Sequence, residues 1–225
     1  MKEQDVISPV IASNSQEMER LLAKSPVLPV MTIPELSDAV PVAKALVSAG
    51  LRIIEVTLRT DCAISAIKAI LHEIPGICVG GGTVTSVQQL ETLHAIGASF
   101  AVSPGLTVDL LRRAKAIGMP YLPGITSVSE LMLGMSEGYE CFKFFPAVAS
   151  GGVATLKSLA GPFSQVKFCP TGGINQDNFA EYYKLSNVVS VGGSWLTPQK
   201  LIEAKDWPQI QKISEQFLAE CSLSS

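Results

Sequence analysis

The sequence alternates short apolar runs with longer amphipathic stretches about eight times, and this alternation restricts the fold more than any other feature. The apolar runs, which we expect to be strands, cover residues 27–33, 51–58, 77–79, 99–102, 121–122, 140–146, 166–169 and 188–191. The amphipathic stretches, which we expect to be helices, cover residues 39–49, 63–73, 86–96, 107–117, 127–137, 152–159 and 175–185, with a helical region from 200 onward. Most of these helices end at a glycine, the usual C-terminal stop. Strands too apolar to face water, each followed by a helix, are typical of a buried parallel sheet.

Eight strand–helix units predict an α/β fold of the (β/α)8 (TIM) barrel type, in which an outer ring of helices covers a closed parallel sheet. We expect a single domain over residues 1–225, since no linker, low-complexity tract or block of charge divides the chain. Residues 1–12 resemble a loose N-terminal arm, and Ser13 is a candidate N-cap for an extra N-terminal helix. An open doubly wound sheet is the alternative, and the number of units favours the barrel.

The composition narrows the classes of partner. Hydrophobic residues make up 47% of the chain and charged residues 16%, which indicates a compact protein with an extensive core. A net charge of -3 gives no footprint for nucleic acid or an anionic membrane surface, so we expect small-molecule partners. No segment has the apolar span of a membrane helix or a signal sequence, and we expect a cytoplasmic protein. The five cysteines show no zinc spacing or disulfide framework, and they fit reduced thiols and no metal site.

One apolar run in the second half carries a single lysine, Lys143. In a strand, Cys141 and Phe145 would share its face, whereas Phe142 and Phe144 would point the other way. A lysine amine among apolar groups is the requirement for Schiff-base chemistry, because burial disfavours the charged form of an amine. The alternative is an edge-strand lysine whose stem covers apolar surface while its head reaches water.

The strand expected over residues 51–58 would direct a carboxylate to the same interior. If Ile54 and Val56 pack under the helices, alternation places Glu55 on the inner face with Lys143. Glu55 could then transfer protons, or it could be a buried structural partner for Lys143 or for Arg59. Arg59, just beyond this strand, could clamp a carboxylate with two hydrogen bonds, although a surface arginine would look the same in sequence.

Glycine-rich segments follow several other expected strands. Those at residues 80–83, 102–105 and 122–126 suit close approach of the backbone to a ligand, and ordinary turns are the alternative for each. The segments at 169–175 and 191–194 follow the last two strands. Loops at these two positions of a barrel recurrently bind phosphate, and a helix N-terminus beyond them adds a favourable dipole. The pair therefore favours a phosphate site.

The residues at these strand ends carry a family resemblance. The matching segments, in chain order, are residues 55–60, 82–84, 103–105, 123–124, 142–146, 170–174 and 192–194. Together they resemble 2-keto-3-deoxy-6-phosphogluconate aldolase, a family often also active as 4-hydroxy-2-oxoglutarate aldolase, over residues 27–195. The resemblance implies a class I aldolase, commonly a homotrimer, that cleaves the phosphorylated sugar acid of the Entner–Doudoroff pathway to pyruvate and glyceraldehyde 3-phosphate.

The resemblance also implies a role for each matching position. Lys143 would form the Schiff base and Glu55 would be the general acid and base, so that no metal or separate cofactor is needed. The substrate would be bound by Arg59 and Thr83 at the pyruvoyl carboxylate, by Pro104 and Phe145 on the pocket wall, and by Thr171, Gly172, Gly173, Gly193 and Ser194 at the phosphate end.

Two departures from the family pattern affect binding rather than chemistry. Many members carry a basic residue near the end of the first strand, where this chain has residues 31–34 (Met-Thr-Ile-Pro), and Gly80 to Thr83 has glycine in place of an alanine. Substrate choice stays open at this point. The alternatives are an aldolase for an unphosphorylated or galactonate-derived keto acid, and a barrel isomerase or binding protein for phosphorylated sugars in which Lys143 only pairs with an anion.

Overall fold

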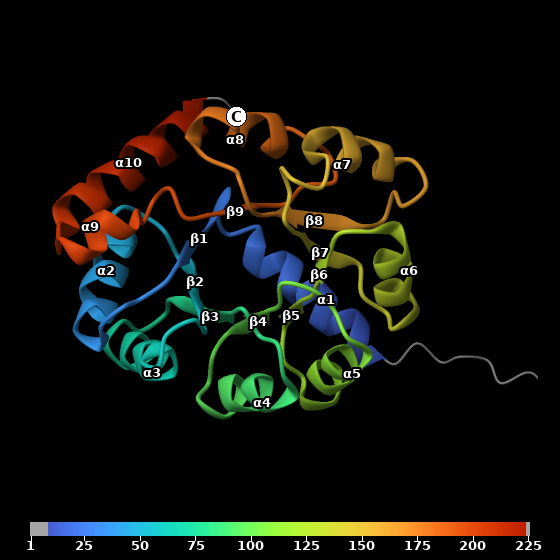
Figure 1. The fold of residues 1–225 in the computed structure, drawn as a ribbon, viewed down its shortest axis with the longest axis horizontal. Helices are drawn as coiled ribbons and strands as arrows, with labels where there is room; N and C mark the ends of the chain where they lie inside the picture. Colours follow the sequence, from blue (N-terminus) through green and yellow to red (C-terminus); the bar gives the residue numbers. More distant parts are fainter. Residues whose placement is uncertain (1–8, 224–225) are drawn as a thin grey trace, which may run out of the picture.

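The structure, a computed structural model, describes residues 9–223, with side chains from residue 14 onward. Figure 1 shows curled strands at the centre with helices around them. The strands are β1 (Val27–Met31), β2 (Ile53–Thr57), β3 (Cys78–Gly82), β4 (Phe100–Val102), β5 (Tyr121–Leu122), β6 (Gly124–Ile125), β7 (Cys141–Phe144), β8 (Lys167–Pro170) and β9 (Val191–Gly193). The helices are α1 (Pro9–Leu22), α2 (Leu36–Ser48), α3 (Ala63–Glu73), α4 (Val87–Ala95), α5 (Val108–Ile117), α6 (Val128–Ser136), α7 (Gly152–Ala160), α8 (Gln176–Tyr183), α9 (Gln199–Glu203) and α10 (Trp207–Leu223).

All paired strands are parallel. Six of them form a sheet in the order β5-β4-β3-β2-β1-β9, and β6-β7-β8 form a second group. Only Pro123 separates β5 from β6, and isolated parallel bridges join Phe168 to Val188 and Thr171 to Gly192, between the β8 and β9 segments. The chain therefore has an α/β fold with a curled parallel sheet, as the alternating pattern predicts.

Two hydrophobic clusters fill the two sides of the strands. The larger lies between strands and surrounding helices and contains Ile54, Val56, Phe142 and Phe144. The smaller lies inside the curled sheet, where side chains from α1 pack on inward residues of the strands. Its buried members are Met18, Leu21, Leu22, Leu28, Ile53, Phe100, Val102, Leu122, Cys141 and Cys169. The extra N-terminal helix thus covers one end of the sheet's inner face.

The N-terminal boundary differs from the sequence prediction. Helix α1 begins at Pro9, so residues 9–12 are helical rather than part of a loose arm, and Ser13 lies within the helix. Proline is favoured in the first turn of a helix, where its missing N–H costs nothing, and this explains the earlier start. The rest of the predicted arm lies outside the described residues. Within residues 9–223, each helix is too short or too polar to cross a lipid bilayer.

The glycine run after Val79 is part of strand β3, not the strand-to-helix turn that the sequence suggested. Close neighbours on both faces require these glycines. A Cβ atom at Gly80 would overlap the Phe100 ring, and one at Gly81 would overlap Leu93. The glycines therefore lie in the sheet because large side chains occupy the space beside them.

Candidate active site

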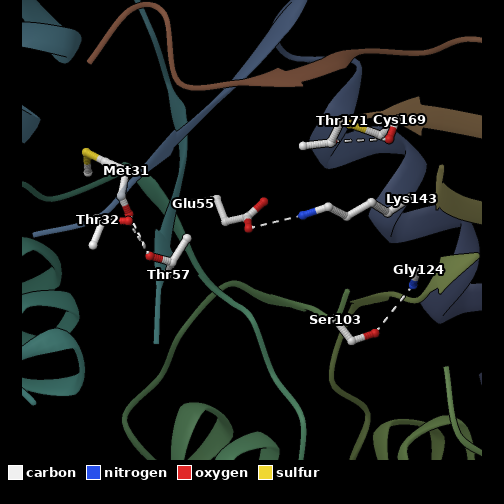
Figure 2. A network of polar contacts seen from close by, with 9 residues as sticks. All are labelled: Met31, Thr32, Glu55, Thr57, Ser103, Gly124, Lys143, Cys169 and Thr171. Carbon is white, nitrogen blue, oxygen red and sulfur yellow. Dashed lines mark hydrogen bonds and ion pairs between the residues drawn. The ribbon is translucent and has the colours of Figure 1, made fainter. Parts of the chain in front are cut away.

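Lys143 and Glu55 point toward each other across the inside of the sheet (Figure 2). Lys143 comes from β7 and Glu55 from β2, and Lys143 Nζ lies 3.5 Å from Glu55 Oε1. Their side chains are only 7% and 1% exposed. Phe142 and Phe144 lie on the opposite face, in the core under the helices, as alternation predicts. The alternative of an exposed edge-strand lysine is wrong, because this amine is buried beside a carboxylate.

A missing side chain makes room for the carboxylate of Glu55. Gly82 ends the neighbouring strand β3, and a Cβ atom there would overlap Glu55 Oε1 and lie 2.7 Å from its Cδ. Glu55 Oε2 is also buried and has no hydrogen-bond partner among the described residues. An unpaired buried carboxylate oxygen is costly and is typical of a functional site. One oxygen therefore faces the amine, while the other has no hydrogen-bond partner among the described residues.

Two thiols border Lys143 inside the sheet. Cys169 of β8 is in register with Lys143, and Cys141 lies two residues before Lys143 on the same strand. Burial raises the pKa of Cys169 to about 12, against a smaller opposing effect of the Lys143 charge, and burial also raises the pKa of Cys141. Both thiols are therefore neutral near pH 7, and the amine is the nucleophile that this layer offers. The Phe145 ring centroid lies 5.3 Å from the amine nitrogen.

A cavity of about 290 Å³ lies at the strand ends. It brings together most of the residues that the sequence assigns to substrate binding: Arg59, Phe145, Thr171, Gly172, Gly173, Gly193 and Ser194. The sequence assigned no binding role to the other lining residues: Val30, Thr32, Ile174, Thr197, Pro198 and Gln199. Thr83 and Pro104 follow β3 and β4 and are not among the lining residues. The cavity thus joins Arg59 to the two late glycine loops.

The loop after β8 has the geometry of an anion site. Gly172 and Gly173 have φ values of 101° and 78°, which favour glycine, and within residues 9–223 their N–H groups make no hydrogen bond. The first-turn N–H groups of α8 are less available, because the Asn175 side chain already accepts hydrogen bonds from those of Asp177 and Asn178. The glycine backbone and nearby hydroxyl groups are therefore the donors for an anion, with the α8 dipole behind them.

Thr83 shows backbone strain at the end of β3. Its φ is 61°, in the left-handed region that a β-branched residue rarely adopts. Such strain persists where the surrounding structure imposes it, and it is concentrated at functional sites. Thr83 directly follows Gly82, whose missing side chain accommodates Glu55.

The structure adds a hydroxyl pair that the sequence did not assign to the site. Thr57 shares the inner face of β2 with Glu55, as alternation predicts, and its Oγ1 lies 2.9 Å from Oγ1 of Thr32. Thr197 also lines the cavity and donates a 3.4 Å hydrogen bond to the Val30 carbonyl. The signal for Thr32 was its place near the end of the strand expected over residues 27–33, whereas nothing in the local sequence marks Thr197.

Metal ligands are not clustered in the described part of the chain. No group of three or more histidine, cysteine, aspartate or glutamate side chains within residues 9–223 could hold a metal ion. The five cysteines are free thiols.

Comparison with known proteins places this chain in a family. A family model described as "KDPG and KHG aldolase" matches residues 18–213. The KHG/KDPG aldolase of Escherichia coli K12 is 52% identical over 205 residues, which cover 91% of this chain and 96% of that protein.

Solved structures give the same result. The KDPG aldolase of Legionella pneumophila, with pyruvate captured as a covalent carbinolamine intermediate, has a TM-score of 0.88 and 46% identity, covering 89% of this chain and 98% of that one. The KDPG aldolase of Zymomonas mobilis ZM4 with 3-phosphoglycerate has a TM-score of 0.87 and 42% identity, covering 91% and 96%. By sequence and by fold, the chain belongs to the KDPG and KHG aldolase family.

Proposed function

We propose that the protein is a class I aldolase that cleaves 2-keto-3-deoxy-6-phosphogluconate to pyruvate and D-glyceraldehyde 3-phosphate through a Schiff base on Lys143. The observation that carries this proposal is the buried pair of Lys143 and Glu55, 3.5 Å apart, with the second carboxylate oxygen of Glu55 unpaired among the described residues. The Legionella relative, captured with pyruvate as a covalent carbinolamine, supports the same chemistry.

The mechanism follows from this geometry. The Lys143 amine attacks the C2 ketone, and the carbinolamine loses water to give a protonated imine. Glu55 takes the proton from the C4 hydroxyl, the C3–C4 bond breaks to release the aldehyde, and the imine accepts the electron pair as an enamine. Glu55 returns a proton to C3, and hydrolysis releases pyruvate and the free amine. Glu55 would exchange these protons with the C4 hydroxyl and with C3 directly or through one water.

The cavity at the strand ends supports a phosphorylated substrate. Its glycine loops and Ser194 offer donors to an anion, and Arg59 adds a cation. The Zymomonas relative was solved with 3-phosphoglycerate. We propose that Thr171, Gly172, Gly173, Gly193 and Ser194 hold the phosphate. Arg59 and Thr83 would hold the pyruvoyl carboxylate, with Pro104 and Phe145 as the pocket wall.

A second activity is part of the same proposal. Homologues named KHG/KDPG aldolase support cleavage of 4-hydroxy-2-oxoglutarate to pyruvate and glyoxylate at this site. That substrate has no phosphate and would leave the glycine loops unfilled. A galactonate-derived keto acid, which differs in configuration at C4, is the alternative substrate.

The finer architecture is also a proposal. We propose a closed (β/α)8 barrel and a single domain, supported by the short gap between β5 and β6 and by the isolated bridges between the β8 and β9 segments. A homotrimer is the assembly that the family resemblance implies. The cytoplasmic location stays a prediction.

The direct test is release of pyruvate from each substrate. We expect turnover with both, loss of both in Lys143→Ala, and competition by inorganic phosphate against the phosphorylated substrate only. Phosphate that competes equally with both substrates would contradict the assignment of the glycine loops. Isomerisation of a sugar phosphate without pyruvate release would contradict the aldolase function itself.

A further inference from the structure

The pair of threonine hydroxyls at the ends of β1 and β2 has no role in the reaction described above. Thr32 directly follows Met31, the last residue of β1, and Thr57 is the last residue of β2. Because Met31 is in register with Val56, Thr32 falls opposite Thr57, and their Oγ1 atoms lie 2.9 Å apart. Figure 2 shows the pair on the Glu55 side of the site, away from the lysine.

The hydrogen bonds between the two threonines leave the Thr32 hydroxyl able to make one further hydrogen bond. Thr57 is buried, and its single proton goes either to the Met31 carbonyl, 3.3 Å away, or to Thr32. In the first case Thr32 donates to Thr57 and keeps a free lone pair. In the second case the proton of Thr32 itself is free, since no other partner within residues 9–223 accepts it. Thr32, which lines the cavity, can therefore accept or donate.

The order of the strands determines which part of a bound substrate lies beside Thr32 and Thr57. Strand β1 lies between β2, which carries Glu55, and β9, which leads to Ser194. A substrate whose C4 hydroxyl reaches Glu55 and whose phosphate reaches Ser194 must cross the end of β1. C5 and C6 lie between these two ends, and C5 carries a free hydroxyl group. This C5 hydroxyl group therefore lies beside Thr32.

We infer that Thr32, held by Thr57, recognises the C5 hydroxyl of the sugar acid and so selects aldehydes that carry a hydroxyl group next to the carbonyl. The inference rests on the aldolase function proposed above. A substrate hydroxyl can donate or accept a hydrogen bond. The two proton arrangements of the threonine pair leave Thr32 able to accept in one case and to donate in the other, so Thr32 can bind such a hydroxyl in either role. A carboxylate or phosphate only accepts, and the glycine N–H groups and Arg59 suit those better.

The test uses aldol addition of pyruvate to two acceptors, D-glyceraldehyde 3-phosphate and 3-oxopropyl phosphate, which lacks only the hydroxyl group. We expect Thr32→Val to lower kcat/KM for the first acceptor by about 2- to 10-fold, the value of one neutral hydrogen bond. With the second acceptor it should change nothing. Thr32→Ser keeps the hydroxyl and should preserve the preference. Thr92→Val, which removes a hydroxyl that bonds only within helix α4, is the matched control.

A separate readout keeps this inference distinct from the proposed function. Exchange of the pyruvate methyl protons in D2O, followed by NMR, needs Lys143 and Glu55 but no aldehyde. Wild-type protein without exchange would contradict the aldolase function. With exchange intact in Thr32→Val, equal losses for both acceptors, or a loss for neither, would overturn the role of Thr32.

Discussion

Replacing Gly82 by alanine should displace the carboxylate of Glu55, the general acid and base, without replacing any reacting group. A Cβ atom at this position would overlap Glu55 Oε1 and lie 2.7 Å from both Cδ and Cγ, closer than real Cβ contacts come. The carboxylate must therefore shift by about 1 Å, and a misplacement of that size can cost about 100-fold in rate. Complete loss of a general acid and base costs about 100- to 10,000-fold. We expect kcat to fall by about 100-fold or more.

The assay compares turnover with Schiff-base formation. Gly82→Ala should still trap pyruvate on reduction with borohydride, because Lys143 is unchanged, while cleavage is slow. The added methyl group should destabilise the fold by about 1–3 kcal/mol as overpacking, which a thermal melt would measure. Gly161→Ala is the matched control, because Gly161 has a φ of -69° and open space around its Cβ position. A folded Gly82→Ala protein with wild-type kcat would refute the reasoning.

Two further predictions follow from the environment of the same pair. Glu55→Gln should leave Lys143 able to form the Schiff base while turnover falls by about 100- to 10,000-fold, as single-turnover and steady-state assays would separate; wild-type turnover would exclude Glu55 as the proton carrier. Cys141 and Cys169 should resist iodoacetamide at pH 8 and react only on unfolding, because burial raises both pKa values, to about 12 for Cys169; mass spectrometry that finds either alkylated in folded protein would contradict their burial.

The sequence predicted the inner face of the site because its signals are local. Period-two alternation places Glu55 and Lys143 opposite Ile54, Val56 and the two flanking phenylalanines, and a buried strand enforces this alternation. Fold class follows from the same local pattern, repeated along the chain.

The features that the sequence missed depend on contacts between distant segments. The glycines at 80–82 look like a turn because glycine usually marks turns, and only the position of Phe100, Leu93 and Glu55 explains them. The pairing of Thr32 with Thr57 depends on the register of β1 and β2, which no single segment encodes. Helix α1 begins at Pro9 because proline suits a first turn, whereas the sequence prediction took Ser13 as the N-cap.

The central claim is that Lys143 forms a covalent imine with pyruvate inside the sheet. Reduction with borohydride in the presence of pyruvate, followed by peptide mass spectrometry, tests it most directly. The account predicts one adduct, on the peptide that contains Lys143, with loss of activity, and no adduct in Lys143→Ala. Labelling of a different lysine, or a Lys143→Ala protein that still traps pyruvate and keeps full activity, would contradict it.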